Sequence, residues 1–98
     1  MKVIGIIPAR YSSNRFPGKP LANILGKSMI QRVYEQCKKC TLLDDVIVAT
    51  DDKRIYNHVL EFGGKIMMTS TTHQSGTDRC NEVIQNIEEQ YDIAINIQ

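Results

Sequence analysis

The stretch VIGIIPAR, residues 3–10, is a short β-branched run that ends at a proline and an arginine. An apolar run of this length, closed by Pro8, predicts a buried strand over residues 3–7. Polar residues without a periodic pattern follow as far as Gly18, which predicts a loop. A buried strand followed by a polar loop is typical of the start of an α/β domain. Such a domain also requires helices and strands to alternate along the rest of the chain.

Three more strand-like runs follow, at residues 46–50, 65–68 and 93–97, and a segment of helical period precedes each of them. This alternation predicts an α/β, Rossmann-like fold of three layers, in which a parallel sheet carries helices on both faces. Ligands of such sheets bind beyond the carboxyl ends of the strands. The expected site is therefore formed by the segments that directly follow the four strands, the last of which is followed by Gln98.

Local capping patterns mark the first two helices. Ser28 and Gln31 form a capping-box pattern ahead of an amphipathic stripe that ends near Cys40. Asp52 is placed to cap the second helix, and the glycine pair at residues 63–64 is expected to end it.

The 98 residues fit one domain at most. A formal net charge of +1 provides no basic field for nucleic acid, and no apolar stretch is long enough to cross a bilayer. The amino-terminal run lacks a cleavage site of small residues, so we expect a cytoplasmic protein. Cys37 and Cys40 form a C-x-x-C late in a predicted helix, without a second ligand pair, and are expected to pack rather than to bind zinc.

The predicted strand at residues 93–97 ends directly before Gln98. Such a strand needs a covering helix or a neighbour, because an open edge exposes unpaired backbone groups. We therefore expect a domain that is truncated at its carboxyl-terminal end.

Three cations, Arg10, Arg15 and Lys19, stand in the segment after the first strand. Small residues between them, Ser12 and Ser13, let backbone N–H groups approach an anion. Arginine offers a planar fork to phosphate oxygens, and lysine offers a mobile point charge. A triphosphate that loses pyrophosphate needs such groups, because negative charge grows on the leaving group. On composition alone, a solvated basic loop remains the alternative.

Two common phosphate motifs are not present. The sequence GKS at residues 26–28 resembles the end of a P-loop, but Leu21 occupies the earlier glycine position and no strand leads into it. No G-x-G-x-x-G follows the first strand, which argues against NAD.

A second polar cluster, at residues 73–79, enters the third predicted helix, for which Thr77 or Asp78 is the expected cap. Capping does not account for the rest of the cluster. An arginine at position 79 can donate to the acceptor edge of a pyrimidine base, with the backbone around Gly76 completing the recognition.

Asp51 and Asp52 follow the second strand, where metal-binding carboxylates are often found. Asp52 is better explained as a helix cap. Asp51 is left to face the nucleotide.

Four short motifs stand in order along the chain: PAR at residues 8–10, RFPGKPL at 15–21, ATDD at 49–52 and SGTDR at 75–79. Together they resemble the 3-deoxy-manno-octulosonate (KDO) cytidylyltransferase family, or CMP-KDO synthetases. INIQ at residues 95–98 is similar to the start of that family's N-x-Q-G-D-E-P segment.

The resemblance implies a cytoplasmic enzyme that transfers CMP from CTP to KDO, releases pyrophosphate and serves lipopolysaccharide biosynthesis. Residues 1–98 would be its nucleotide-binding half. Arg10 and Lys19 would be catalytic, at the triphosphate, while residues 75–79 and Gln98 would surround the cytosine. The complete set of implied nucleotide-binding residues is Pro8, Ala9, Arg10, Ser12, Ser13, Arg15, Lys19, Asp51, Ser75, Gly76, Arg79 and Gln98.

The same resemblance implies Mg²⁺ as the cofactor. Its aspartate ligand would lie beyond Gln98, so no metal ligand is expected within this chain. Sugar binding and the contacts of a homodimer would also come from later residues, and no nucleic acid or membrane partner is expected.

Other readings of the sequence stay open. A sialic acid or related nonulosonate cytidylyltransferase would share the nucleotide half, although the SGTDR segment favours KDO. A non-catalytic α/β binding domain, such as a signal receiver, would need an acidic pair after the first strand, where Pro8 and Ala9 stand. An inactive fragment is the remaining alternative.

Overall fold

The computed structural model describes residues 1–11, 18–70, 76–87 and 90–97. In chain order its elements are β1 (Val3–Ala9), the 3-10 helix η1 (Lys19–Leu21), β2 (Asn23–Ile24), β3 (Lys27–Ser28), α1 (Met29–Lys38), β4 (Asp45–Thr50), α2 (Lys53–Glu61), β5 (Ile66–Met68), α3 (Gly76–Asn86) and β6 (Ile93–Asn96).

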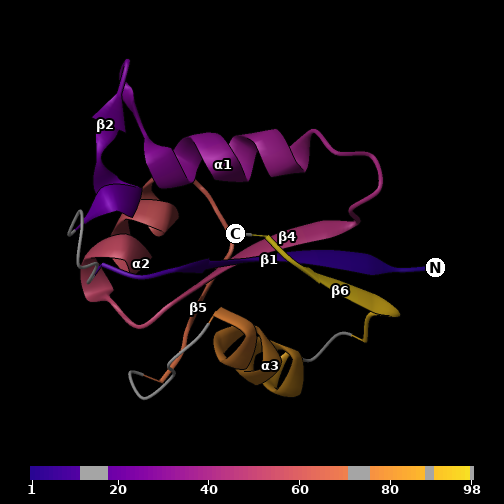
Figure 1. Ribbon diagram of the computed structural model, residues 1–98. Coiled ribbons are helices and arrows are strands. Elements are labelled where there is room, and N and C mark those ends of the chain that lie inside the picture. The colour runs from indigo at the N-terminus through magenta and orange to yellow at the C-terminus, as the bar shows by residue number, and fades with distance from the viewer. Residues whose placement is uncertain (12–17, 71–75, 88–89, 98) are drawn as a thin grey trace.

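Four strands form one parallel sheet in the order β5-β4-β1-β6 (Figure 1). In its register, Ala9 of β1 lies opposite Thr50 of β4, and Ile6 lies opposite Asn96 of β6. The chain extends the sheet from β1 through β4 to β5, and then crosses back to place β6 on the other side of β1. The strand order therefore reverses between β1 and β6, which is where doubly wound sheets bind their ligands.

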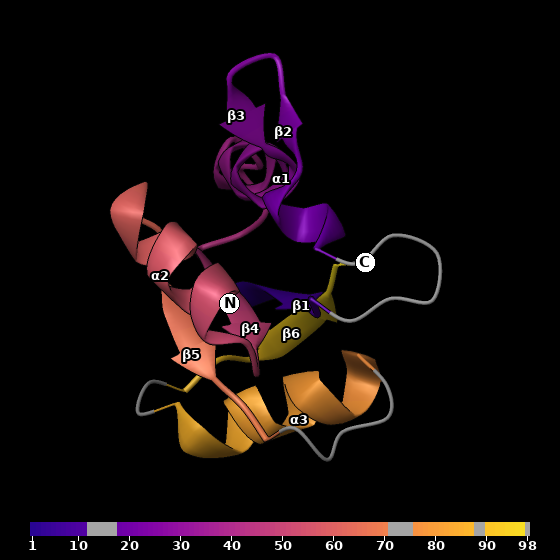
Figure 2. The ribbon, with the colours of Figure 1, turned by 90° about the vertical axis from the view of Figure 1, so that its left-hand side faces the viewer.

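Helices α1 and α2 cover one face of the sheet, and α3 covers the other (Figure 2). Successive side chains of the two central strands alternate between these faces, as the pleat requires. Ile7 and Val48 pack under α1 and α2. Ile6 and Ile47 pack against α3, together with its Val83. The predicted three-layer α/β fold is confirmed.

The predicted caps of the first two helices form. The side chain of Ser28 accepts a hydrogen bond from the backbone N–H of Gln31 at 3.2 Å. Asp52 accepts two hydrogen bonds from backbone N–H groups in the first turn of α2. Gly63 follows that helix with φ at 81°, the left-handed conformation that commonly terminates helices.

One local prediction is wrong, and one element was not predicted. Helix α3 already begins at Gly76, so Thr77 and Asp78 lie inside its first turn and neither caps it. The β2–β3 hairpin was not predicted at all. Its turn residues Leu25 and Gly26 have φ of 53° and 92°, the positive pair that a two-residue hairpin requires. A leucine rarely adopts that conformation, so the sequence carries no turn pattern there.

Cys37 packs against the core beneath α1, whereas Cys40 is exposed. Burial, with a smaller contribution from Cys40, raises the pKa of the Cys37 thiol. The packing prediction for the pair therefore holds for Cys37 only.

Strand β6 forms one edge of the sheet, and no described strand pairs with its outer side. Its side chains Ile93 and Ile95 are 40% and 43% exposed.

Across the described ranges, none of the helices has the length and hydrophobicity needed to span a membrane.

Candidate nucleotide site

The first predicted catalytic residue lies at the carboxyl end of strand β1. Arg10 directly follows the last residue of the strand, and its side chain is exposed. Ala9 before it is buried and Pro8 is half-buried, so the strand end itself is anchored in the sheet. A rigid strand therefore presents an exposed cation at the point where the strand order reverses.

The second predicted catalytic residue, Lys19, begins η1 and is also exposed. The backbone N–H of Gly18 donates a hydrogen bond of 2.7 Å to the carbonyl of Tyr11. This contact joins the residue after Arg10 to the residue before Lys19, so the backbone brings the two cations near each other. Neither cation forms an ion pair with a described residue.

The position of Gly18 requires a glycine for two reasons. Its φ is 73°, a left-handed conformation that residues with a Cβ disfavour. A Cβ at this position would also lie 2.9 Å from Cε2 of Tyr11. The tight closure between Tyr11 and Gly18 therefore depends on the missing side chain.

Arg79 occupies a different environment, because its side chain is 1% exposed. Its Nη1 donates to Oγ1 of Thr69 at 2.5 Å and to the carbonyl of Ser70 at 3.4 Å. Its Nη2 donates to Oδ2 of Asp51 at 3.2 Å, which also forms an ion pair. Its Nε is buried and has no hydrogen-bond partner among the described residues.

Asp51 and Arg79 were predicted as two contacts to the nucleotide, and the structure joins them to each other. The pairing is physically reasonable, because a guanidinium withdrawn from water needs a nearby carboxylate. The direct contact between Arg79 and a base stays a prediction, and Nε is a donor that no described residue uses.

The first turns of α3 connect the carboxyl ends of three strands. Arg79 reaches Asp51 after β4 and Thr69 after β5. On the other side of the helix start, Nδ2 of Asn96 in β6 lies 3.5 Å from Oγ1 of Thr77. The start of α3 is thus fixed at the edge of the sheet where the carboxyl ends of these strands lie.

Several predicted nucleotide-binding residues lie outside the described residues: Ser12, Ser13, Arg15, Ser75 and Gln98. Gly76 is described only as the first residue of α3.

The described residues do not fit a Mg²⁺ site. They bring no three His, Cys, Asp or Glu side chains together. Asp51 pairs with Arg79, and Asp52 both caps α2 and binds Arg54. The hydrogen bonds from Arg54, followed by those from the backbone, lower the pKa of Asp52. Both carboxylates at this strand end are therefore already used.

Sequence reasoning missed three residues of this region: Tyr11, Arg54 and Thr69. Their contacts reach across elements, so no local pattern reveals them. The one available indication for Thr69 was its place directly after a strand, where a polar side chain faces the ligand edge.

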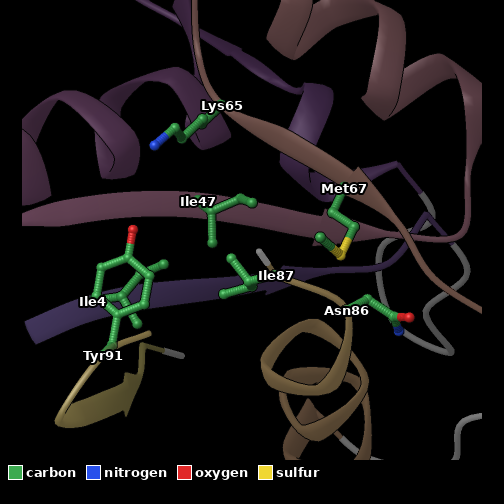
Figure 3. A pocket seen from close by; sticks show the side chains of 7 residues that line it. All are labelled: Ile4, Ile47, Lys65, Met67, Asn86, Ile87 and Tyr91. Atoms are coloured by element: carbon green, nitrogen blue, oxygen red, sulfur yellow. The ribbon is translucent and has the colours of Figure 1, made fainter. Parts of the chain in front are cut away.

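The structure also has a pocket of about 300 Å³ between the sheet and α3 (Figure 3). Its lining residues are Ile4, Ile47, Lys65, Met67, Asn86, Ile87 and Tyr91. Tyr91 and Lys65 both bind Asp45, the first residue of β4, so the pocket lies toward the amino ends of the strands. It is therefore separate from the predicted nucleotide site.

The model of the cytidylyltransferase family matches residues 4–98. The 3-deoxy-manno-octulosonate cytidylyltransferase of Parabacteroides distasonis is 65% identical over 98 residues, which cover 100% of this chain and 38% of that protein. The mitochondrial 3-deoxy-manno-octulosonate cytidylyltransferase of Arabidopsis thaliana is 54% identical over 97 residues, or 99% of this chain and 33% of that protein. The chain thus spans less than half the length of these curated relatives.

Similarity extends to a solved structure, CMP:2-keto-3-deoxy-manno-octonic acid synthetase complexed with CTP. It superposes with a TM-score of 0.94 at 51% sequence identity, covering 100% of this chain and 40% of that one. The family match extends over nearly all of the sequence, and the fold agrees with it. The chain therefore belongs to the cytidylyltransferase family.

Proposed function

We propose that residues 1–98 are the nucleotide-binding half of a cytidylyltransferase domain, and that the whole protein transfers CMP from CTP to KDO. The observation that carries this proposal is the pair of exposed cations, Arg10 and Lys19, which the Tyr11–Gly18 contact brings together beside β1. Similarity to a synthetase described as complexed with CTP supports it.

In the proposed reaction, the anomeric hydroxyl of the sugar attacks the α-phosphorus of CTP. The bond from that phosphorus to the bridging oxygen breaks, pyrophosphate leaves, and the hydroxyl proton is released. Arg10 and Lys19 would bind the β- and γ-phosphates and stabilise the charge that develops on the leaving group. The protein contributes positioning and charge neutralisation, without a covalent intermediate.

We propose that the cytosine binds near the start of α3, at residues 75–79, and near Gln98. The support is that α3 begins at the ligand-bearing edge of the sheet, beside the ends of β4, β5 and β6. Nε of Arg79 has no hydrogen-bond partner among the described residues, but it is buried, so the position of the helix start carries this part of the proposal.

Mg²⁺ remains part of the proposal on the family resemblance, as a cation that would neutralise phosphate charge when bound. No residue described here is assigned to it, because Asp51 and Asp52 are held by arginines. We also propose a cytoplasmic homodimer that serves lipopolysaccharide biosynthesis, without nucleic acid or membrane partners. A nonulosonate substrate is the weaker alternative, because the curated relatives are KDO enzymes by name.

The test uses a complete cytidylyltransferase whose residues 1–98 have this sequence. It is called the full-length enzyme below. With CTP and Mg²⁺, we expect pyrophosphate release with KDO and little release with sialic acid. ATP in place of CTP should not support the reaction. Release that depends on sialic acid rather than KDO, or equal use of ATP and CTP, would contradict the proposal.

A further inference from the structure

Arg54 and Tyr11 stack on each other, although they lie in different elements. The central guanidinium carbon of Arg54 lies 3.2 Å from the centroid of the Tyr11 ring. Arg54 is in the first turn of α2, and Tyr11 is the second residue after β1. A guanidinium over an aromatic face is attracted by the negative potential of the ring.

The orientation of this guanidinium is set by Asp52. Nε of Arg54 donates to Oδ1 of Asp52 at 3.1 Å, and Nη2 donates to Oδ2 at 2.7 Å. The same carboxylate accepts hydrogen bonds from the backbone N–H groups of Arg54 and Ile55. The helix start therefore fixes the carboxylate, and the two parallel bonds fix the plane of the guanidinium.

Tyr11 in turn contacts the far end of the segment that follows it. Its carbonyl accepts the hydrogen bond from Gly18, and its ring lies so close to Gly18 that a Cβ there would collide with it. Tyr11 is adjacent to Arg10, and Gly18 is adjacent to Lys19. One ring thus links the rigid start of α2 to the backbone beside both cations.

We propose that Arg54 is a positioning residue for the nucleotide, which acts through Tyr11 to hold Arg10 and Lys19 at the spacing that the triphosphate requires. The inference rests on the proposed function. Arg54 does not need to touch the ligand, because its guanidinium is already engaged by Asp52 and by the Tyr11 ring.

The exposure of Arg54 separates this role from a merely structural one. Its side chain is 58% exposed, so truncating it should change the stability of the fold little. An effect on catalysis without an effect on stability is the expected signature of positioning.

The experiment compares Arg54→Ala, Tyr11→Ala and the double variant in the full-length enzyme, measuring kcat and KM for CTP. We expect each single variant to lower kcat/KM on the order of 10-fold, since misplaced binding groups reduce turnover. The double variant should be no worse than either single variant, because both break the same contact. Thermal unfolding of Arg54→Ala should match that of the parent enzyme.

Conservative and matched variants complete the test. Tyr11→Phe keeps the ring and should retain most of the activity. Arg54→Lys keeps a cation but not the planar fork and should recover only part of it. Lys53→Ala removes an exposed cation from the same turn and should have no effect.

Additive losses in the double variant would overturn the proposal, because they would mean that Arg54 acts independently of Tyr11. Parent-like kinetics in Arg54→Ala would also overturn it. If the parent enzyme releases no pyrophosphate from CTP and KDO, the proposed function itself is contradicted. This outcome differs from a failure of the positioning proposal, because it is seen before any residue is replaced.

Discussion

Arg10 and Arg79 are arginines at the same edge of the sheet, yet burial gives them different roles. Arg10 is exposed and forms no ion pair with a described residue, so its charge is available to an incoming anion. Arg79 is 1% exposed, and its charge is compensated by Asp51 before any ligand binds. Arg10 should therefore matter for turnover alone, and Arg79 for the stability of the fold as well.

Replacing either exposed cation should impair catalysis without unfolding the domain. We expect Arg10→Ala and Lys19→Ala in the full-length enzyme to lower kcat on the order of 100-fold, because in the proposed reaction each cation stabilises the charge on the leaving group. Lys27→Ala is the control, since Lys27 pairs with Glu35 on the surface. Near-normal turnover in Arg10→Ala, with unchanged circular dichroism, would show that Arg10 is only a solvated surface charge without a role in catalysis.

Replacing Arg79 should destabilise the protein. Arg79→Met leaves Asp51 without its partner and should lower the free energy of unfolding by on the order of 3 kcal/mol, as when one member of a buried pair is removed. Urea unfolding of the full-length enzyme measures this. The double variant Asp51→Asn with Arg79→Met should recover part of the loss, because no unpaired charge remains. If the double variant is as unstable as Arg79→Met, the contact with Asp51 is not the reason that Arg79 stabilises the fold.

At the scale of elements, the amino end of β4 is tied to the segments that lead into β5 and β6. Asp45, the first residue of β4, accepts a hydrogen bond of 2.6 Å from the hydroxyl of Tyr91, which precedes β6. It also pairs with Lys65, which precedes β5, at 3.6 Å. The Tyr91 hydrogen bond is the main reason that the pKa of Asp45 is lowered. One carboxylate therefore connects the segments that lead into two other strands.

This contact predicts a pH-dependent contribution to stability. A lowered pKa means that the folded state favours the carboxylate, so the stabilisation is present above the ordinary value of 3.8 and is lost as the pH falls below it. We expect Tyr91→Phe to destabilise the full-length enzyme at pH 7 by about 1 kcal/mol or less, because the carboxylate is partly exposed. The difference should shrink below pH 3.8 in urea unfolding.

Tyr56→Phe is the matched control for this measurement, since its hydroxyl has no hydrogen bond to a described residue. A Tyr91→Phe effect that stays constant down to pH 3 would be incompatible with a role through the Asp45 carboxylate.

At the scale of the whole molecule, the open edge at β6 adjoins an apolar groove. The groove has a volume of about 420 Å³ and is lined by Gln36, Cys37, Cys40, Leu43, Ile95 and Ile97. Exposed backbone edges with apolar side chains favour association. The chain also covers only 38% of the length of its Parabacteroides distasonis relative. Under the proposed function, the residues that bind the sugar would lie in the rest of the whole protein.

The isolated polypeptide of residues 1–98 should therefore associate and should not turn over CTP. Light scattering is expected to show a mass above that of a monomer, and Ile95→Lys should lower it because the charge blocks the β6 edge. Ile84→Lys on α3, which is similarly exposed at 49%, should leave the mass unchanged. Sustained pyrophosphate release by this polypeptide from CTP, Mg²⁺ and KDO would mean that a complete site exists within it.

Sequence alone determined the order and type of the main elements. The alternation of β1 and β4 residues between two faces follows from the strand period of two, and the caps at Ser28 and Asp52 use hydrogen bonds within three residues of the cap. These are local interactions, so a short stretch of chain is sufficient to predict them. The same periodicity locates the end of β1, so the sequence alone places Arg10 directly after a strand. The role of Arg10 and Lys19 at the triphosphate stays a prediction.

Tertiary structure decided which side chains meet. Arg79 binds Asp51, 28 residues away, and Arg54 stacks on Tyr11, 43 residues away, through pairings that depend on the order of strands in the sheet. No local pattern encodes such distances, because helix packing against the sheet sets the direction of each side chain. The same packing buries one arginine and leaves another exposed. That is why sequence reasoning could assign both to the nucleotide, while only the fold could distinguish a free cation from a paired one.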